Sequence, residues 1–324
     1  MEASPRKSRL RTFRLPEIQN LTEFSNQIRL SESAIKKYIT FAEHYYFTYG
    51  IPKKTGGERL IAQPSRELKA IQSWLLRNIL DKLPSSASSK GFELGTSIYN
   101  NASPHIGSNV ILSFDIDNFF PSIPANKVYG VFCSCGYNKR ISSAFTSICT
   151  FKGFLPQGSP ASPKLANLVC LNLDSRIQGY AGKHGITYTR YADDITLSCH
   201  SIKKIEKAKT FIPTVIKDEG FKLNKQKTRL MGLRKRKSVT GLVVNLNKAG
   251  VGREVYREMR VKIHRLFIDE ADNYSHINGW LSFIYGIDDE IYNKLYVYIK
   301  NLSEKYPFSD AINNLLAKPP RIIP

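Results

Sequence analysis

Two adjacent aspartates, Asp193 and Asp194, lie between two short runs in which polar and apolar residues alternate, ITYTRY and ITLSC. This pattern predicts a β-hairpin with two carboxylates at its tip. Aspartate is common in tight turns, so an ordinary hairpin turn is one interpretation. However, neighbouring carboxylates raise each other's pKa and are unfavourable unless a cation compensates for them. The hairpin tip is therefore also a suitable half of a site for Mg²⁺, which prefers hard oxygen ligands.

A third carboxylate, Asp115, lies near the end of the apolar run ILSFDI at residues 111–116. Such a run predicts a buried strand, where an uncompensated aspartate is unfavourable because removing its charge from water costs free energy. If this strand lies beside the hairpin, Asp115, Asp193 and Asp194 converge. Three carboxylates can hold two divalent ions about 3.5–4 Å apart, an arrangement that supports in-line phosphoryl transfer. Asp117 shares the strand side of Asp115, although a solvated helix cap is the favoured interpretation of that residue.

The charge of the chain favours a polyanionic partner. Its 324 residues include 48 Lys and Arg against 27 Asp and Glu, a net charge of +21. Between Lys225 and Arg265 there are thirteen basic residues and two acidic ones, which accounts for about half of the excess. Apolar residues interleave with these charges, so we expect a folded segment with a basic surface. An ordinary solvated surface is one interpretation, and contact with a nucleic acid backbone is the other.

Other features argue against a membrane-spanning or secreted protein. No apolar run approaches the roughly 20 residues that a membrane span requires. The N-terminus, MEASPRKSRLRTFRLPE, is basic and lacks the apolar segment of a signal peptide. The five cysteines are an odd number without a CxxC pair, so we expect them to be reduced. These observations predict a cytoplasmic protein with no membrane partner.

The remaining chain alternates helical and strand-like patterns. Helices are expected from Ser31 to about Ile39 and again after Ser65, where apolar residues recur at helical spacing. Residues 41–62 contain an aromatic run, a Gly56-Gly57 turn and a second apolar run, which predicts a two-stranded hairpin. The interleaving of helices and strands predicts an α+β fold, and the length corresponds to about two domains.

Three segments, FDIDNFF, LPQGSPASP and YADD, occur in the order of motifs A, B and C of reverse transcriptases. The chain resembles this family from about residue 45 to 300. The resemblance implies an RNA-directed DNA polymerase with a right-hand fold of fingers, antiparallel-sheet palm and mainly helical thumb. The implied divisions are a basic N-terminal helical extension (1–40), fingers (41–108), a palm with finger helices inserted between motifs A and B (109–238), and the thumb with a C-terminal tail (239–324).

The same resemblance assigns roles around the carboxylates. The aspartates matching Asp115, Asp193 and Asp194 are the metal ligands of reverse transcriptases, in agreement with the argument from charge. Two Mg²⁺ ions are implied, with Mn²⁺ as a possible substitute, and the backbone carbonyl of Ile116 is a further ligand. Lys227, in a segment that resembles motif D, is a candidate proton donor to pyrophosphate, with a solvated lysine as the alternative.

A group of cations flanks the Gly-Gly turn of the expected hairpin, namely Lys53, Lys54 and Arg59. A hairpin that carries cations can close over a triphosphate, whose charge must be neutralised as it reacts. These residues resemble the finger residues that bind the incoming nucleotide. A basic surface hairpin is the alternative.

Two further elements of the family pattern concern the nucleotide. In the family, the residues matching Gln157 and Gly158 lie against the nucleotide and the template, and glycine lets the backbone approach a ligand closely. An aromatic residue after the first aspartate excludes the ribose 2′-hydroxyl. Spacing leaves both Phe119 and Phe120 open for this role, and plain core packing is expected of the other one.

Two short motifs resemble those of bacterial retron reverse transcriptases. Residues 101–105 (NASPH) match the NAxxH element, and residues 239–241 match the VTG element. The residues that we assign to RNA binding on this basis, together with the exposed arginines expected after them, are Asn101, His105, Val239, Thr240, Gly241, Arg253, Arg257, Arg260 and Arg265. A core or capping histidine is an equal alternative for His105.

The retron resemblance also implies partners. These are dNTPs, a cognate structured noncoding RNA (msr-msd), and the branched RNA-linked product, multicopy single-stranded DNA (msDNA), started from a 2′-hydroxyl. Host RNase H acting on the product and an effector protein in anti-phage defence are implied as well. Two alternatives remain: a group II-like or standalone reverse transcriptase with 3′-hydroxyl priming, and an RNA-binding scaffold with an inactive polymerase site.

Overall fold

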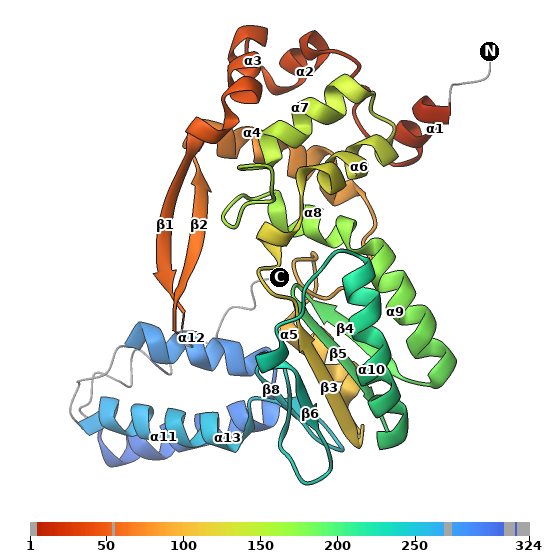
Figure 1. Ribbon diagram of the computed structural model, residues 1–324. Coiled ribbons are helices and arrows are strands. Elements are labelled where there is room, and N and C mark those ends of the chain that lie inside the picture. The colour runs from red at the N-terminus through yellow and green to blue at the C-terminus, as the bar shows by residue number, and fades with distance from the viewer. Residues whose placement is uncertain (1–4, 54–55, 269–273, 308–314, 316–324) are drawn as a thin grey trace.

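The computed structural model describes residues 5–53, 56–268, 274–307 and residue 315. At its centre lies a four-stranded antiparallel sheet with the strand order β4-β5-β3-β6 (Figure 1). The strands are β3 (Val110–Asp115), β4 (Thr187–Tyr191), β5 (Asp194–Cys199) and β6 (Arg229–Met231). Strands β3 and β5 are buried along almost their whole length, which explains why their sequences are apolar runs. The strand and hairpin predicted around the aspartates are confirmed.

Helices cover this sheet and extend away from it. They are α4 (Arg66–Asn78), α6 (Ala125–Cys135), α7 (Lys139–Cys149), α8 (Ser162–Val169), α9 (Leu171–His184) and α10 (Ile202–Asp218). Helix α4 begins where the sequence predicts, because the Ser65 hydroxyl accepts a hydrogen bond from the Leu68 N–H at 3.3 Å. Helix α6 ends at Gly136, whose φ of 108° lies in the left-handed region that glycine favours.

Three short helices, α1 (Pro5–Thr12), α2 (Leu21–Ile28) and α3 (Glu32–Thr40), precede this body and pack on α6 and α7. Ser31 caps α3 as predicted, by accepting a hydrogen bond from the Ala34 N–H. Phe24 of α2 is fully buried and packs edge-on against Phe145 of α7, with ring centroids 5.0 Å apart. This N-terminal segment therefore belongs to the main hydrophobic core.

The predicted hairpin is confirmed as β1 (Tyr46–Pro52) and β2 (Glu58–Pro64), which form a separate two-stranded sheet. In Figure 1 it projects from the helical body toward α12. Only Tyr46 of β1 is buried, because the rest of the strand extends beyond the core. The hairpin is thus an arm attached at its base.

The C-terminal part has a second hydrophobic core. A small sheet of β7 (Lys237–Val239), β8 (Leu242–Val244) and β9 (Ala249–Gly250) leads into three helices, α11 (Gly252–Ile268), α12 (Tyr274–Tyr285) and α13 (Asp289–Lys305). Helix α5 (Ile98–Ala102) contacts β7, β8 and β9 and also β4, so it bridges the two sheets. The expected division between residues 238 and 239 falls inside β7.

Most basic side chains of the segment 225–265 are exposed, while Lys248 and Lys262 are half-buried and one lysine is buried. Lys237 is buried, and its ammonium group donates a 2.6 Å hydrogen bond to the backbone oxygen of Ser108. The expectation of a surface charge is wrong for this residue, because its strand packs on the loop before β3. Among the described helices, none combines the length and apolar character that crossing a membrane requires. All five cysteines are free thiols.

Candidate active site

The central sheet brings the three predicted aspartates together. Asp115 ends β3 and is the direct cross-strand partner of Asp194, which begins β5. Asp193 lies in the β4–β5 turn, and its backbone oxygen accepts a 3.0 Å hydrogen bond from the N–H of Ile116. The turn itself requires an unusual backbone, since Ala192 has a φ of 55°. Strand register and turn conformation therefore fix the relative positions of the carboxylates.

Burial and mutual repulsion shape the titration of this group. Burial, reinforced by the charges of Asp193 and Asp115, raises the pKa of Asp194 to about 6. Burial also raises the pKa of Asp193, although its backbone hydrogen bonding counteracts part of this effect. A site with these properties favours a positive charge close to the carboxylates.

Lys227 supplies such a charge. Its ammonium group forms a 2.9 Å ion pair with Asp115 Oδ2, and this hydrogen bond is the main reason that the lysine pKa is raised. Lys227 follows the 220–224 segment, where the N–H of Asn224 bonds to the backbone oxygen of Asp115 at 2.9 Å. The motif D residue thus lies beside the aspartates and is protonated at neutral pH.

Carboxylate oxygens are the donors that Mg²⁺ and Mn²⁺ take, so the chemistry of the three aspartates fits a hard divalent cation. In the described ranges, no set of three or more His, Cys, Asp or Glu side chains is arranged closely enough to hold a metal ion. Ile116 directly follows Asp115, and its side chain is buried.

The β1–β2 arm carries the expected cations. Lys53 and Arg59 are exposed near the tip, whereas Lys54 lies outside the described residues. Burial raises the pKa of Asp193, and the charge of Arg59 is the smallest of the effects that oppose this rise. Arg59 therefore has only a weak electrostatic effect on Asp193, from a separate sheet.

Backbone contacts join this arm to the motif B loop. The N–H of Ala62 donates a 2.8 Å hydrogen bond to the backbone oxygen of Gln157. Gly158 has a φ of 132°, and a Cβ added there would lie 2.7 Å from the backbone oxygen of Ala62. Glycine is required at position 158 because β2 lies too close to leave room for a side chain. Gln157 and Gly158 therefore set where the arm leaves the body.

The two phenylalanines after motif A differ in burial. Phe119 is only 5% exposed and packs near Phe221, with ring centroids 6.1 Å apart. Phe120 is partly exposed, and its ring lies 6.1 Å from that of Phe92. Phe92 in turn lies 6.2 Å from the ring of Tyr191, the residue that opens the aspartate turn. Of the two candidates, Phe120 is therefore the more exposed.

The residues of the two retron-like motifs meet in space, mostly inside the protein. The buried Asn101 donates a 3.3 Å hydrogen bond to the Thr240 hydroxyl, and Val239 is 2% exposed. The His105 ring is fully buried between the hydroxyls of Ser198 and Thr189, at 2.6 and 2.8 Å. These interior side chains offer no surface to RNA in this structure. Their contacts instead join α5 and the β7–β8 turn to the central sheet.

Burial also lowers the pKa of His105 to about 4. His105 therefore lies in the core, as one of its two interpretations from the sequence expected. Thr240 and Gly241 form the β7–β8 turn, with φ values of 45° and 85°. Gly241 is exposed and Thr240 is half-buried, so this turn reaches the surface.

All four predicted thumb arginines are exposed on α11. Arg253, Arg257 and Arg260 follow at helical spacing on one face. The guanidinium carbon of Arg260 lies 4.4 Å from the ring centroid of Tyr298 on α13. Arg260 is therefore engaged within the thumb. Arg265 lies farther along the helix.

The sequence argument missed a buried ion pair beneath the aspartate turn. Arg190 is fully buried and donates two 2.7 Å hydrogen bonds to the carboxylate of Asp174, which is equally buried. The same guanidinium donates to the backbone oxygen of Ala192 at 3.1 Å and to Asn167 at 3.1 Å. The sequence did contain a sign of this ion pair, because Arg190 occupies a position of the alternating run ITYTRY that is expected to face the interior. Arg190 thereby supports the conformation of the turn that carries Asp193.

Comparisons with known proteins agree with this site. Residues 51–246 match the family model described as "Reverse transcriptase (RNA-dependent DNA polymerase)". This span includes the three aspartates, the arm from Ile51 onward and the motif B loop. The class of protein defined by fold and site is therefore that of the reverse transcriptases, with the predicted right-hand fold.

Curated relatives narrow the class. The chain is 52% identical over 300 residues to "Retron Ec86 reverse transcriptase" from Escherichia coli, covering 92% of this chain and 94% of that protein. It is 31% identical to "Retron Mx65 reverse transcriptase" from Myxococcus xanthus, over 88% of this chain and 72% of that protein. The chain belongs to the bacterial retron reverse transcriptases and is an RNA-directed DNA polymerase. Members of this family act with a noncoding RNA and use dNTPs, and reverse transcriptases in general require divalent metals.

Proposed function

We propose that this enzyme copies part of a cognate msr-msd RNA into branched, RNA-linked msDNA, starting from a 2′-hydroxyl of that RNA. The observation that carries the catalytic part is the cross-strand pairing of Asp115 with Asp194, beside Asp193. Similarity to retron reverse transcriptases over 94% of the length of a relative supports the choice of template and product. Anti-phage defence with an effector protein, and trimming of copied RNA by host RNase H, belong to the same proposal.

In this proposal Asp115, Asp193 and Asp194, with the backbone oxygen of Ile116, hold two Mg²⁺ ions, which Mn²⁺ can replace. When bound, the ions supply charge neutralisation and polarise the attacking hydroxyl. Although burial raises the pKa of Asp194 to about 6, neutral pH lies above this value, so most of the carboxylate is ionised and available as a ligand. Lys227 exchanges its ion pair with Asp115 for a position from which it protonates the leaving pyrophosphate.

The incoming dNTP lies between the arm and the palm. Lys53, Lys54 and Arg59 neutralise the triphosphate, and the exposure of Lys53 and Arg59 near the tip of the arm supports this assignment. Gln157 and Gly158 hold the arm against the body and border the nucleotide. Phe120, rather than the buried Phe119, excludes the ribose 2′-hydroxyl.

RNA is held by the C-terminal part, for which we retain the predicted limits of the thumb and tail, 239–324. Arg253, Arg257 and Arg265 contact phosphates, together with the β7–β8 turn. Asn101, His105 and Val239 contribute indirectly, since their buried contacts fix that turn relative to the central sheet. Arg260 contributes through its packing on Tyr298 as well as its charge.

The decisive experiment compares the wild type with Asp193→Asn, expressed with the native flanking DNA. Nucleic acid that co-purifies is treated with RNase A and separated on a denaturing gel. We expect a discrete short DNA whose mobility shifts on RNase treatment, and we expect it only with the wild type. RNA should co-purify with both. Synthesis by Asp193→Asn would refute the metal site.

The same gel separates the alternatives. RNA without DNA, combined with synthesis on an added primer–template, would indicate ordinary 3′-hydroxyl priming instead. RNA with no synthesis on any template would indicate a scaffold. The intact set of three aspartates argues against a scaffold, because buried like charges are unfavourable without a bound cation.

A further inference from the structure

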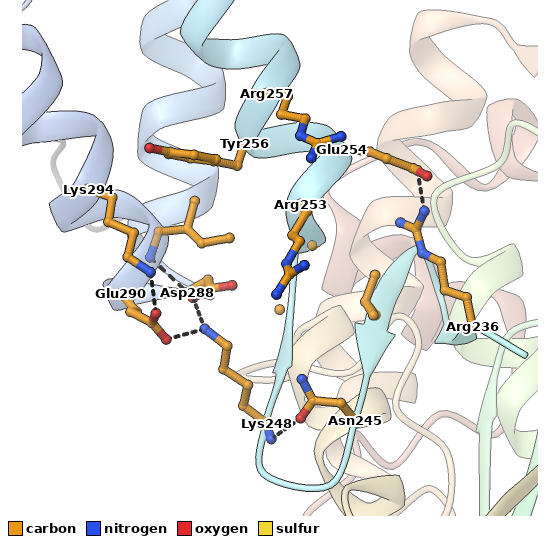
Figure 2. A pocket seen from close by; sticks show the side chains of 14 residues that line it. Arg236, Asn245, Lys248, Arg253, Glu254, Tyr256, Arg257, Asp288, Glu290 and Lys294 are labelled. Atoms are coloured by element: carbon orange, nitrogen blue, oxygen red, sulfur yellow. Dashed lines mark hydrogen bonds and ion pairs between the residues drawn. The ribbon is translucent and has the colours of Figure 1, made fainter. Parts of the chain in front are cut away.

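A cavity of about 740 Å³ lies at the base of the thumb, between the β7–β8–β9 sheet and the first turns of α11 and α13 (Figure 2). Its volume is in the range of roughly 300–1,000 Å³ that is typical of small-ligand sites. None of the three aspartates of the active site lines it. It is therefore a separate feature of the molecule, and neither sequence motifs nor the polymerase reaction accounts for it.

One wall of this cavity is cationic. Arg253 and Arg257 of α11 are exposed, and among the described residues neither has an ion-pair partner. Arg236 stands on the same side, where it pairs with Glu254. Figure 2 shows the guanidinium of Arg253 projecting between the small sheet and α13. Unpaired guanidinium groups that converge on a hollow favour a phosphate.

The opposite wall holds a buried carboxylate with an unused acceptor. Asp288 is 5% exposed and caps α13, since its Oδ1 accepts hydrogen bonds from Lys248 Nζ at 3.0 Å and from the Ile291 N–H. Its Oδ2 is buried without any hydrogen-bond partner. In Figure 2 the carboxylate faces the cavity and Arg253. A carboxylate is an acceptor only, so the group that completes Asp288 must be a donor.

The space around Asp288 Oδ2 depends on a glycine at position 250. A Cβ added to Gly250 would lie within 2.1 Å of Asp288 Oδ2, so only glycine leaves room for the carboxylate in this orientation. Lys248 bridges Asp288 and Glu290, with Nζ 2.7 Å from the Glu290 carboxylate, and Lys294 pairs with Glu290 at 2.5 Å.

We propose that this cavity binds a single unstacked nucleotide of the RNA. Its phosphate lies against Arg253 and Arg257, and a base that carries an exocyclic amino group donates to Asp288 Oδ2. Free phosphate could pair with the arginines but could not donate a hydrogen bond to Asp288, whereas a nucleotide can do both. Tyr256 lines the same cavity and offers an aromatic face on which the base stacks. The inference rests on the proposed RNA binding by α11 and adds base recognition to it.

The test uses the full chain, freed of nucleic acid and kept in EDTA so that the aspartates bind no nucleotide through a metal. The probes are labelled cytidine and uridine pentamers, which have the same charge but present an amine or a carbonyl at the same ring position. We expect the wild type to bind the cytidine pentamer about tenfold more tightly. Equal affinities would overturn the proposal.

Variants separate base recognition from charge. Asp288→Asn keeps an oxygen to cap α13 but places an amide donor at the Oδ2 position, so the preference for cytidine should disappear while uridine binding is retained. Arg253→Gln should weaken both pentamers and reduce the slope of log affinity against log salt by about one. Thermal unfolding establishes that each variant folds. If Asp288→Asn does not fold, the wild-type preference and Arg253→Gln still decide the outcome.

The matched control is Arg265→Gln, which removes an exposed arginine from the same helix outside the cavity. We expect a smaller loss and an unchanged preference for cytidine. If Arg253→Gln and Arg265→Gln weaken both pentamers equally and no preference exists, the basic surface of α11 remains and the nucleotide pocket is refuted. If neither variant changes binding, the proposed RNA surface itself fails.

Discussion

Removing the carboxylate of Asp174 should destabilise the fold far more than removing an exposed carboxylate nearby. The change Asp174→Ala leaves the guanidinium of Arg190 charged, fully buried and without its two 2.7 Å hydrogen bonds. It also removes the acceptor of the Tyr188 hydroxyl, at 2.6 Å. Breaking one side of a buried ion pair costs about 3–5 kcal/mol, because the remaining charge stays unsolvated. A typical free energy of unfolding is only about 5–15 kcal/mol.

The assay is urea unfolding followed by circular dichroism. With a slope of about 3 kcal/mol per molar urea, the midpoint should fall by roughly 1 M or more. Asp218→Ala is the matched control, since Asp218 pairs with Arg176 on the surface, and we expect it to leave the midpoint nearly unchanged. A loss below about 1 kcal/mol for Asp174→Ala would refute the reasoning.

A double variant tests the cause of that loss. If the unpaired charge is responsible, Asp174→Leu combined with Arg190→Met should be more stable than Asp174→Ala alone, because no charge then remains in the core. Its polymerase activity should nevertheless stay low, since Arg190 donates to the backbone oxygen of Ala192 within the aspartate turn. Equal instability of the two variants would point to lost packing instead.

Three further outcomes are expected. Gly158→Ala should lower the free energy of unfolding and the affinity for dNTP, because the added Cβ would meet the backbone of Ala62. The control is Gly153→Ala, where φ is positive but the space is open. It should lower the free energy of unfolding only by the backbone strain of about 1–3 kcal/mol. His105, with its pKa lowered to about 4, stays neutral while the unfolded chain protonates near 6.5, so stability should fall by about 2 kcal/mol from pH 7.5 to 5; His105→Gln should lack this fall in urea titrations at the two pH values. Phe120→Ala should incorporate ribonucleotides in primer extension, and unchanged discrimination would return the role to Phe119.

Much of this architecture could be predicted because its signals are local. The alternating runs on each side of Asp193 and Asp194 specify a hairpin, and the apolar run before Asp115 specifies a buried strand. Likewise, Ser31 and Ser65 mark helix starts through hydrogen bonds that span three residues. The order of three short motifs then indicated the polymerase family, which the match over residues 51–246 confirmed.

Other properties depend on contacts between residues far apart in the chain. Spacing cannot distinguish Phe119 from Phe120, because the choice depends on Phe221 and Phe92. The burial of His105 depends on two hydroxyls more than 80 residues away. Motif residues that a sequence assigns to RNA binding can therefore lie in the interior and act through the elements they join.

The sequence by itself determined the class of the protein, its three candidate carboxylates and the basic character of its C-terminal part, because period, charge and motif order are properties of neighbouring residues. Only the tertiary structure decided that Asp115 faces Asp194 across a strand pair, that Arg190 and Asp174 support the turn from below, and that Asp288 faces unpaired arginines across a cavity. The physical reason is that strand register, burial and charge pairing are set by the packing of segments distant in sequence.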